Sequence, residues 1–181
     1  MLIIKTKKQV NIIIDKSQTA CLTGYRPDKL PWGYDENKVN CIQFKIDLKK
    51  TFIGAINYGL KTFLTGMAEG FDMIATEILI SLRRIYPIQI IAVIPCIGQE
   101  KKWSTTQQKR YHKILSNCDE KIILNKYYTP TCMIERNKFM VEHSSVVIAC
   151  YSGLAGGTRS TIKLAKENNS KIKIINPNYY T

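Results

Sequence analysis

Histidine and long apolar runs are scarce in this sequence, and each shortage excludes a class of protein. The two histidines, His112 and His143, are too few for a histidine-rich metal site, and we expect no metal ion. No stretch approaches the ~20 apolar residues of a membrane-spanning helix. The first residues, MLIIKTKKQVNIIID, are interrupted by Lys, Gln and Asn and do not form a signal-peptide core. The sequence therefore predicts a cytoplasmic protein without a membrane partner.

Cysteine pairs at metal-binding or redox spacing are also missing. No two of the six cysteines form a CxxC motif, and the cysteines are scattered along the chain: Cys21, Cys41, Cys96, Cys118, Cys132 and Cys150. Several of them lie within apolar, strand-like runs. We therefore interpret them as buried free thiols in a reducing compartment, and not as disulfides or zinc ligands.

Acidic residues are also in short supply. The chain has 14 Asp and Glu against 27 Lys and Arg, which gives a net charge of +13. An excess of this kind suggests a polyanionic partner, such as nucleic acid, an anionic membrane or a phosphate-bearing ligand. The basic residues are dispersed, however, with no basic tail and no long basic block. Charge alone therefore predicts a basic surface and does not single out nucleic acid.

The chain length of 181 residues favours a single domain. Short β-rich runs alternate with longer helical stretches, which is typical of a parallel sheet covered by helices on both faces. We expect strands at 20–23, 62–65, 88–94, 121–124, 145–150 and 171–175, and helices at 39–58, 69–86, 104–117, 130–143 and 158–168. The sequence thus predicts an α/β three-layer sandwich with a mostly parallel central sheet of about six strands. Residues 1–18 are expected to add an edge segment or hairpin before the domain of residues 19–181.

Ligands of open α/β sheets bind at the carboxyl ends of the strands, so the residues that follow each strand are the candidates for a site. After the first expected strand come Gly24, Arg26, Trp32 and Tyr34. A glycine lets the backbone approach a ligand, a guanidinium suits a phosphate, and aromatic rings offer flat faces to a base. The alternative is a loop whose aromatic residues pack back onto the domain.

The second expected strand is followed by a turn of small residues that opens a helix. Gly66, Met67, Ala68 and Gly70 form the turn, and Asp72 falls in the first helical turn. Free backbone N–H groups and the helix dipole favour an anion at such a place. Asp72 either caps its own helix or binds a ribose hydroxyl.

A double glycine, Gly156 and Gly157, precedes the helix after the fifth expected strand, and Thr158 supplies a hydroxyl at its start. This arrangement has the form of a phosphate cradle. Tyr151 and Thr161, on either side of it, are further candidate binding residues. A plain glycine-rich turn is the alternative, and the occurrence of two such turns weakens that alternative.

The third expected strand is followed by the candidates Pro95, Gln99, Trp103 and Arg110. Trp103 and Arg110 share one face of a helix. For both of them, packing in the core and lining of the site remain equally open alternatives.

The fourth expected strand leads to Tyr127, Cys132, Arg136 and Asn137. Cys132 and Arg136 fall on one stripe of a helix, and a cation among apolar neighbours has a buried partner or faces a cavity. A nucleophilic Cys132 beside Arg136 is an alternative, but no histidine is placed to act as its base. We therefore interpret Cys132 as a structural thiol beside the binding site.

Six stretches follow one another along residues 19–177: TGYRPDKLPWGYDE (23–36), TGMAEGFDMIATE (65–77), IPCIGQEKKW (94–103), RYHKIL (110–115), YYTPTCMIERNKFMV (127–141) and IACYSGLAGGTRSTIKLAK (148–166). In this order they resemble the YpsA family of the SLOG superfamily. That superfamily of Rossmann-like nucleotide-binding domains is named after its SMF/DprA and LOG members. Many relatives have histidine where Tyr25 stands.

The resemblance implies a Rossmann-like fold and a nucleotide-type ligand held by the turns at residues 66–72 and 156–158. LOG-type enzymes, which cleave the base from a nucleoside monophosphate, carry a PGGxGTxxE signature. Thr161 stands where those enzymes have the glutamate, and a hydroxyl does not stabilise a cationic sugar as a carboxylate does. The resemblance therefore favours binding over catalysis, with Asp72 and Glu69 as the candidate catalytic residues if a reaction occurs.

The sequence is compatible with three functions. The first is a bacterial or phage protein that senses or sequesters a nucleotide-derived signal, such as an ADP-ribose-like, NAD-related or cyclic species, without a further cofactor. Sequestration in phage counter-defence is one form of it. The second is a nucleotide N-glycosidase similar to the LOG enzymes, and the third is single-stranded nucleic-acid binding similar to DprA. A homo-oligomer is an open alternative for each.

Overall fold

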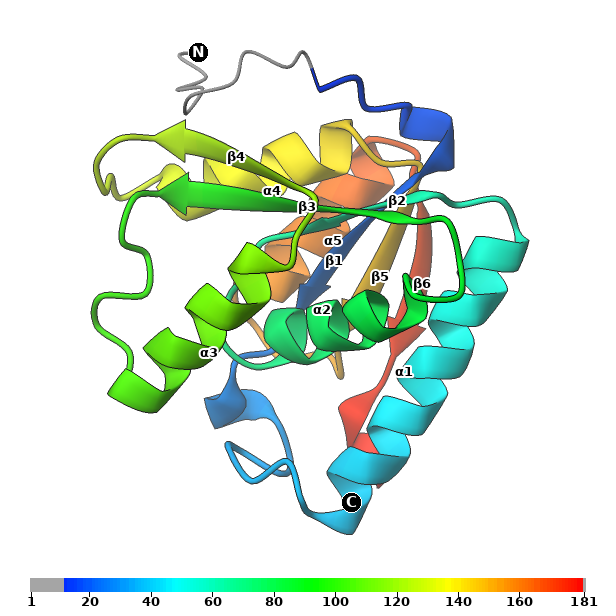
Figure 1. Ribbon diagram of the computed structural model, residues 1–181, viewed down its shortest axis with the longest axis vertical. Helices are drawn as coiled ribbons and strands as arrows, with labels where there is room; N and C mark the ends of the chain where they lie inside the picture. Colours follow the sequence, from blue (N-terminus) through cyan, green and yellow to red (C-terminus); the bar gives the residue numbers. More distant parts are fainter. Residues whose placement is uncertain (1–11, 181) are drawn as a thin grey trace.

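Six parallel strands form the central sheet of this computed structural model, which describes residues 12–180. They lie in the order β4-β3-β2-β1-β5-β6, and every neighbouring pair runs parallel (Figure 1). Their bounds are β1 (Thr19–Gly24), β2 (Thr62–Thr65), β3 (Gln89–Cys96), β4 (Glu120–Asn125), β5 (Val146–Cys150) and β6 (Lys171–Ile175). The predicted parallel sheet is confirmed.

Helices cover both faces of the sheet (Figure 1). Three pack in a row on one face and two pack together on the other: α1 (Val39–Asn57), α2 (Phe71–Leu82) and α3 (Thr105–Ser116), and opposite them α4 (Cys132–Glu142) and α5 (Gly157–Glu167). Alternate residues of β1 face the two layers, because Ala20 and Leu22 join the apolar cluster under α1 and α2, whereas Cys21 joins the cluster under α4 and α5. The protein is thus a Rossmann-like three-layer sandwich.

The order of the strands reverses beside β1. From β1 the chain adds β2, β3 and β4 outward on one side, and then returns to place β5 and β6 on the other side. Gly24, the last residue of β1, is in register with Cys150, the last residue of β5. The loops that leave these two strands therefore diverge at one edge of the sheet, which is where open α/β sheets bind their ligands.

Two helices begin two residues later than the sequence predicts. α2 starts at Phe71 and not at Glu69, because Gly70 adopts a φ of +85° that a helix cannot contain. A side chain on Gly70 would also stand 2.6 Å from the carbonyl oxygen of Tyr25. α4 starts at Cys132 and not at Pro130.

The hairpin predicted for residues 1–18 falls mainly on residues 1–11, which lie outside the described residues. Residues 12–15 have no regular secondary structure, and Ile12 and Ile14 pack against the apolar cluster under α4 and α5. A short 3-10 turn, η1 (Lys16–Gln18), then leads into β1.

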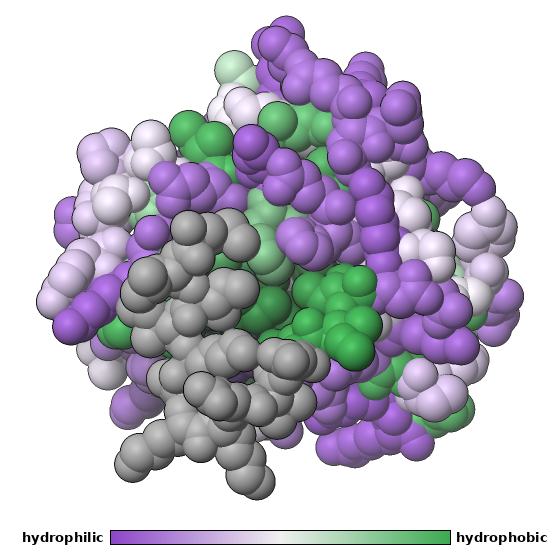
Figure 2. Space-filling model, turned by 90° about the horizontal axis from the view of Figure 1, so that it is seen from above, coloured by the Kyte–Doolittle hydropathy of each residue, from purple (hydrophilic) through white to green (hydrophobic). Residues whose placement is uncertain are grey.

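Hydrophilic residues dominate the surface seen from above in Figure 2, where apolar residues form patches among them. Within residues 12–180, no helix is both long and apolar enough to cross a bilayer. In the same part of the chain, no three histidine, cysteine or acidic side chains are grouped to hold a metal ion.

The close approach of β1 to α2 gives a first testable prediction. Gly24 lies against the ring of Phe71, and an added Cβ would stand 2.4 Å from two of the ring carbons. Gly24→Ala is therefore expected to lower the free energy of unfolding by about 1–3 kcal/mol through overpacking, as measured by urea denaturation.

Gly54→Ala is the matched control, because Gly54 lies inside α1 and a Cβ there has no neighbour within 4 Å. The same substitution is expected to raise the free energy of unfolding by about 0.5–1 kcal/mol, since alanine favours the helix. Equal effects of the two substitutions would contradict the packing argument.

Candidate functional site

A cavity of about 280 Å³ lies at the carboxyl ends of β1 and β5, where the strand order reverses. Loops that follow β1, β2 and β5 line it together with α4. The cavity brings together nine residues that the sequence singled out: Gly24, Arg26, Ala68, Asp72, Arg136, Asn137, Gly156, Gly157 and Thr158. It also includes Asp28, Lys29, Met133 and Ala155, which the sequence analysis did not name as site residues.

Tyr25 connects the loops that form this cavity. Its carbonyl oxygen accepts a hydrogen bond from the backbone N–H of Phe71 at 3.1 Å, which fixes the start of α2. Its hydroxyl oxygen accepts from the backbone N–H groups of Ser152 and Leu154 at 3.0 and 2.9 Å, in the loop after β5. The sequence does not predict this role for Tyr25, because its partners are distant in sequence and the local motif does not indicate them.

The turn after β2 is held from two sides. Arg136 of α4 donates from Nη1 to the carbonyl oxygen of Gly66, and a Cβ on Gly66 would stand 1.9 Å from that nitrogen. Gln99 donates to the same oxygen at 3.4 Å and to the carbonyl oxygen of Met67 at 3.3 Å. Met67 itself has a φ of +53° and a buried side chain, an uncommon combination that this support maintains. Gln99 therefore supports the turn and does not line the cavity.

Two opposite charges lie buried at the floor of the cavity. Asp72 and Arg136 are 5% and 6% exposed, and the Asp72 carboxylate accepts a hydrogen bond from the N–H of Ala68 at 3.2 Å. Burial raises the pKa of Asp72, and the charge of Arg136 opposes that rise. Burial likewise lowers the pKa of Arg136, and the charge of Asp72 opposes that change. Each group therefore favours the charged form of the other.

Three exposed charged residues line the cavity, namely Arg26, Asp28 and Lys29. Lys29 donates from Nζ to the carbonyl oxygen of Ala155 at 2.8 Å. α5 begins beside it at Gly157, and the N-cap Gly156, at a φ of +136°, leaves room for the Lys29 ammonium, which would stand 2.9 Å from a Cβ at that position. The first N–H groups of α5 and the positive end of its dipole thus face the same space as two cationic side chains.

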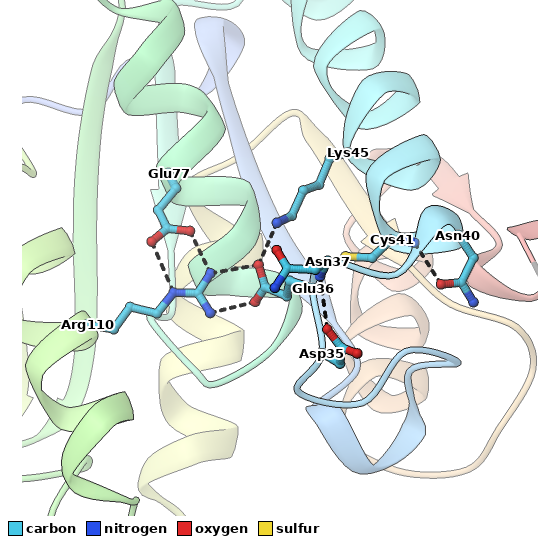
Figure 3. Close-up of polar contacts among 8 residues, drawn as sticks. All are labelled: Asp35, Glu36, Asn37, Asn40, Cys41, Lys45, Glu77 and Arg110. Carbon is cyan, nitrogen blue, oxygen red and sulfur yellow. Dashed lines mark hydrogen bonds and ion pairs between the residues drawn. The ribbon is translucent and has the colours of Figure 1, made fainter.

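Arg110 stands outside this cavity, contrary to its predicted role as a binding residue. Figure 3 shows its guanidinium between Glu77 of α2, at 3.0 and 2.6 Å, and Glu36 of the loop before α1, at 2.5 and 3.1 Å. Lys45 of α1 completes the network with a 2.7 Å ion pair to Glu36. Despite partial burial, hydrogen bonds from Arg110 and Lys45 hold the pKa of Glu36 below its ordinary value. Arg110 therefore anchors a loop and two helices and is not free for a phosphate.

The predicted base-stacking tryptophans also belong to the core. Trp32 is 1% exposed, and its ring packs 4.8 Å from that of Phe44. Trp103 packs edge to face against Tyr111 at 5.4 Å. Neither ring lines the cavity at β1 and β5, because each ring packs against aromatic partners within the domain.

The remaining predicted residues are not among those that line the cavity: Gly66, Met67, Gly70, Pro95, Tyr127, Cys132, Tyr151 and Thr161. Tyr127 is 70% exposed, while Cys132 is a buried free thiol. The Thr161 hydroxyl donates to the carbonyl oxygen of Gly157 at 2.9 Å within α5. Tyr34 and Glu69 meet in a neighbouring cavity, where the Tyr34 hydroxyl donates to the Glu69 carboxylate at 3.4 Å.

Comparison with known sequences places this geometry in a family. The YpsA family model, described as the YspA SLOG family, matches residues 20–179. The SPbeta prophage-derived protein YoqJ of Bacillus subtilis is 34% identical over 118 residues, which are 58% of this chain and 69% of YoqJ. A UPF0398 protein of Halalkalibacterium halodurans is 26% identical over 164 residues, which are 86% of each chain.

Two solved structures share the fold. DNA processing protein A from Helicobacter pylori, described for its single-stranded DNA binding mode, superposes with a TM-score of 0.58 at 20% identity, over 89% of this chain and 66% of that one. DprA from Streptococcus pneumoniae superposes with a TM-score of 0.62 at 16% identity, over 89% of this chain and 51% of that one. This chain is thus similar to only part of each DprA, and the likeness concerns the fold.

The family match begins inside β1 and ends within the last described residues, so it contains every strand and helix that forms the cavity. The chain therefore belongs to the YpsA family of SLOG proteins.

Proposed function

We propose that this protein binds a phosphate-bearing nucleotide in the cavity at the ends of β1 and β5. The observation that carries the proposal is the start of α5 at Gly156–Gly157, which lines the cavity together with Arg26 and with Lys29, whose ammonium lies beside Gly156. Backbone N–H groups at a helix start bind phosphate oxygens, and two cations add charge-assisted hydrogen bonds.

The size of the cavity suits the phosphate end of such a ligand. Its 280 Å³ lies just below the ~300–1,000 Å³ of pockets that enclose whole drug-sized molecules. The rest of the nucleotide would extend toward the neighbouring cavity, which shares Arg26 and Asp28 with the first.

Binding is favoured over cleavage by the state of the candidate catalytic groups. Thr161 replaces the glutamate of the LOG-type signature and is hydrogen-bonded within its own helix. Asp72 is buried against Arg136 and accepts from Ala68, so its carboxylate already has partners. We therefore propose that the protein senses or sequesters a nucleotide-derived signal, such as an ADP-ribose-like or cyclic species. The prophage origin of YoqJ is compatible with a role in phage counter-defence.

Single-stranded nucleic-acid binding is the second candidate, favoured by the net charge of +13 and by the fold shared with DprA. Fluorescence anisotropy with a labelled single strand at 50 and 200 mM salt would identify it. A protein that neutralises several phosphates loses orders of magnitude in affinity over that range, whereas a mononucleotide site loses far less.

The cradle itself can be tested with variants of the two cations. Arg26→Ala and Lys29→Ala are each expected to weaken binding about tenfold, because each removes a charged donor to phosphate. Isothermal titration calorimetry against a panel of nucleoside mono- and diphosphates, cyclic dinucleotides and ADP-ribose would measure this change.

Lys166→Ala is the matched control, since Lys166 is an exposed lysine in the last turn of the same helix whose first turn forms the cradle. It removes an equal charge far from the cavity and is expected to leave the affinity within about twofold of the parent. A loss equal to that of Arg26→Ala would show that overall charge, and not the cradle, drives binding.

Tyr25 offers a separate test of how the cradle is held. Tyr25→Phe removes the hydroxyl oxygen that accepts hydrogen bonds from the backbone N–H groups of Ser152 and Leu154. We expect about 1–3 kcal/mol less stability and faster hydrogen exchange at these two amides. Tyr179→Phe, at an exposed position, is the control and should change neither the stability nor the hydrogen exchange. Unchanged exchange at Ser152 and Leu154 in Tyr25→Phe would contradict the proposed role of the hydroxyl.

A further inference from the structure

A second cavity, of about 710 Å³, opens beside the phosphate cradle. The loop of residues 26–34 forms most of its wall, and Lys38 and Glu69 complete it. Arg26 and Asp28 belong to both cavities. In the turn after β2, Ala68 lines the first cavity and the next residue, Glu69, lines the second. A ligand held at Arg26 by its phosphate would therefore enter the second cavity with the group attached to that phosphate.

Of the two carboxylates that line this cavity, Asp28 is exposed and Glu69 is buried. It is 8% exposed, and one carboxylate oxygen accepts from the Tyr34 hydroxyl at 3.4 Å, a long hydrogen bond. Burial raises the pKa of Glu69, and the hydrogen bond from Tyr34 and the charge of Arg26 oppose that rise. A buried carboxylate with spare acceptor capacity favours a ligand that brings hydrogen-bond donors.

A second group in the same wall has an unused hydrogen bond. The indole N–H of Trp32, whose residue lines the second cavity, is buried and has no acceptor within the described part of the chain. Buried donors without partners are rare in folded proteins. Trp32 is only 1% exposed, however, so Glu69 and not this indole is the group available to a ligand in the cavity.

Resting on the proposed function, we infer that the second cavity receives the ribose of the nucleotide and that Glu69 accepts hydrogen bonds from its vicinal hydroxyls. Ribose is the group next to the phosphate in a nucleotide, and its hydroxyls donate charge-assisted hydrogen bonds to a carboxylate. A 2′-deoxyribose would leave part of the buried carboxylate without a donor. A site built around a hydroxyl rejects the analogue that lacks it, so the protein selects ribonucleotides over deoxyribonucleotides.

Paired titrations test this selectivity. The four ribonucleoside diphosphates and their 2′-deoxy counterparts are titrated by calorimetry, with pyrophosphate as the probe of the cradle alone. For each base that binds, we expect the ribonucleotide to bind at least about tenfold more tightly than the deoxy form. The ratio should shrink as the pH falls toward the raised pKa of Glu69, because the protonated carboxyl no longer carries the charge that strengthens these bonds.

Two variants of Glu69 connect the selectivity to this carboxylate. Glu69→Ala is expected to reduce the ratio below about threefold, and Glu69→Gln, which keeps the size of the side chain, to an intermediate value. Neither change should weaken pyrophosphate binding, since both remove a negative charge near an anion site. Glu142→Ala, on the exposed side of α4, is the matched control and should keep the parental ratio.

The outcomes separate the two proposals. Equal affinities for ribo and deoxy forms, or a ratio that Glu69→Ala and Glu69→Gln leave intact, would overturn the ribose assignment while nucleotide binding stands. If the folded parent binds no nucleotide and no pyrophosphate, both the cradle and the ribose assignment are overturned.

Discussion

The hydrogen bonds of Tyr25 are the constraint on which the rest of the site depends. One residue connects the end of β1 to the start of α2 through its carbonyl oxygen and to the loop after β5 through its hydroxyl. Loops usually vary in position more than the elements that they join. Here three loops are fixed to one another, so the glycine cradle keeps its distance from Arg26 before any ligand arrives, and binding need not first order these loops.

The cations of this protein fall into different roles that a net charge conceals. Arg136 is buried near Asp72 and donates a hydrogen bond to the carbonyl oxygen of Gly66, so its guanidinium stabilises the turn after β2. Arg110 is shared by Glu36 and Glu77 and holds α3 against α2 and the loop before α1. Arg26 and Lys29 remain at the cavity mouth. Under the proposed function, the charge that binds the ligand is therefore local, and the dispersed excess would attract anions to the surface without selecting among them.

The strands and helices were predictable because alternating β-rich and helical runs leave little choice of layers. The glycine turns after β2 and β5 were predictable as turns that open a helix, since the residues that form them are adjacent in sequence. The roles of Arg110 and Trp32 were not, because a cation or a ring after a strand looks the same whether it turns to a cavity or to the core. Their partners, Glu77 and Phe44, are decided only by tertiary packing. The role of Tyr25 could not be predicted for the same reason.

The pairing of β1 with β5 also bears on how the protein is made. Tyr25 and Ser152 are 127 positions apart, yet their hydrogen bond closes the cavity. Joining residues so far apart carries a loop-closure entropy cost, which the contacts of the intervening elements must offset. A nascent chain that ends before β5 leaves one edge of β1 without a partner and lacks half of the cradle. A ligand of the proposed kind would therefore meet the complete cavity only once β5 and α5 are in place, and its binding would stabilise that state over every shorter or partly folded one.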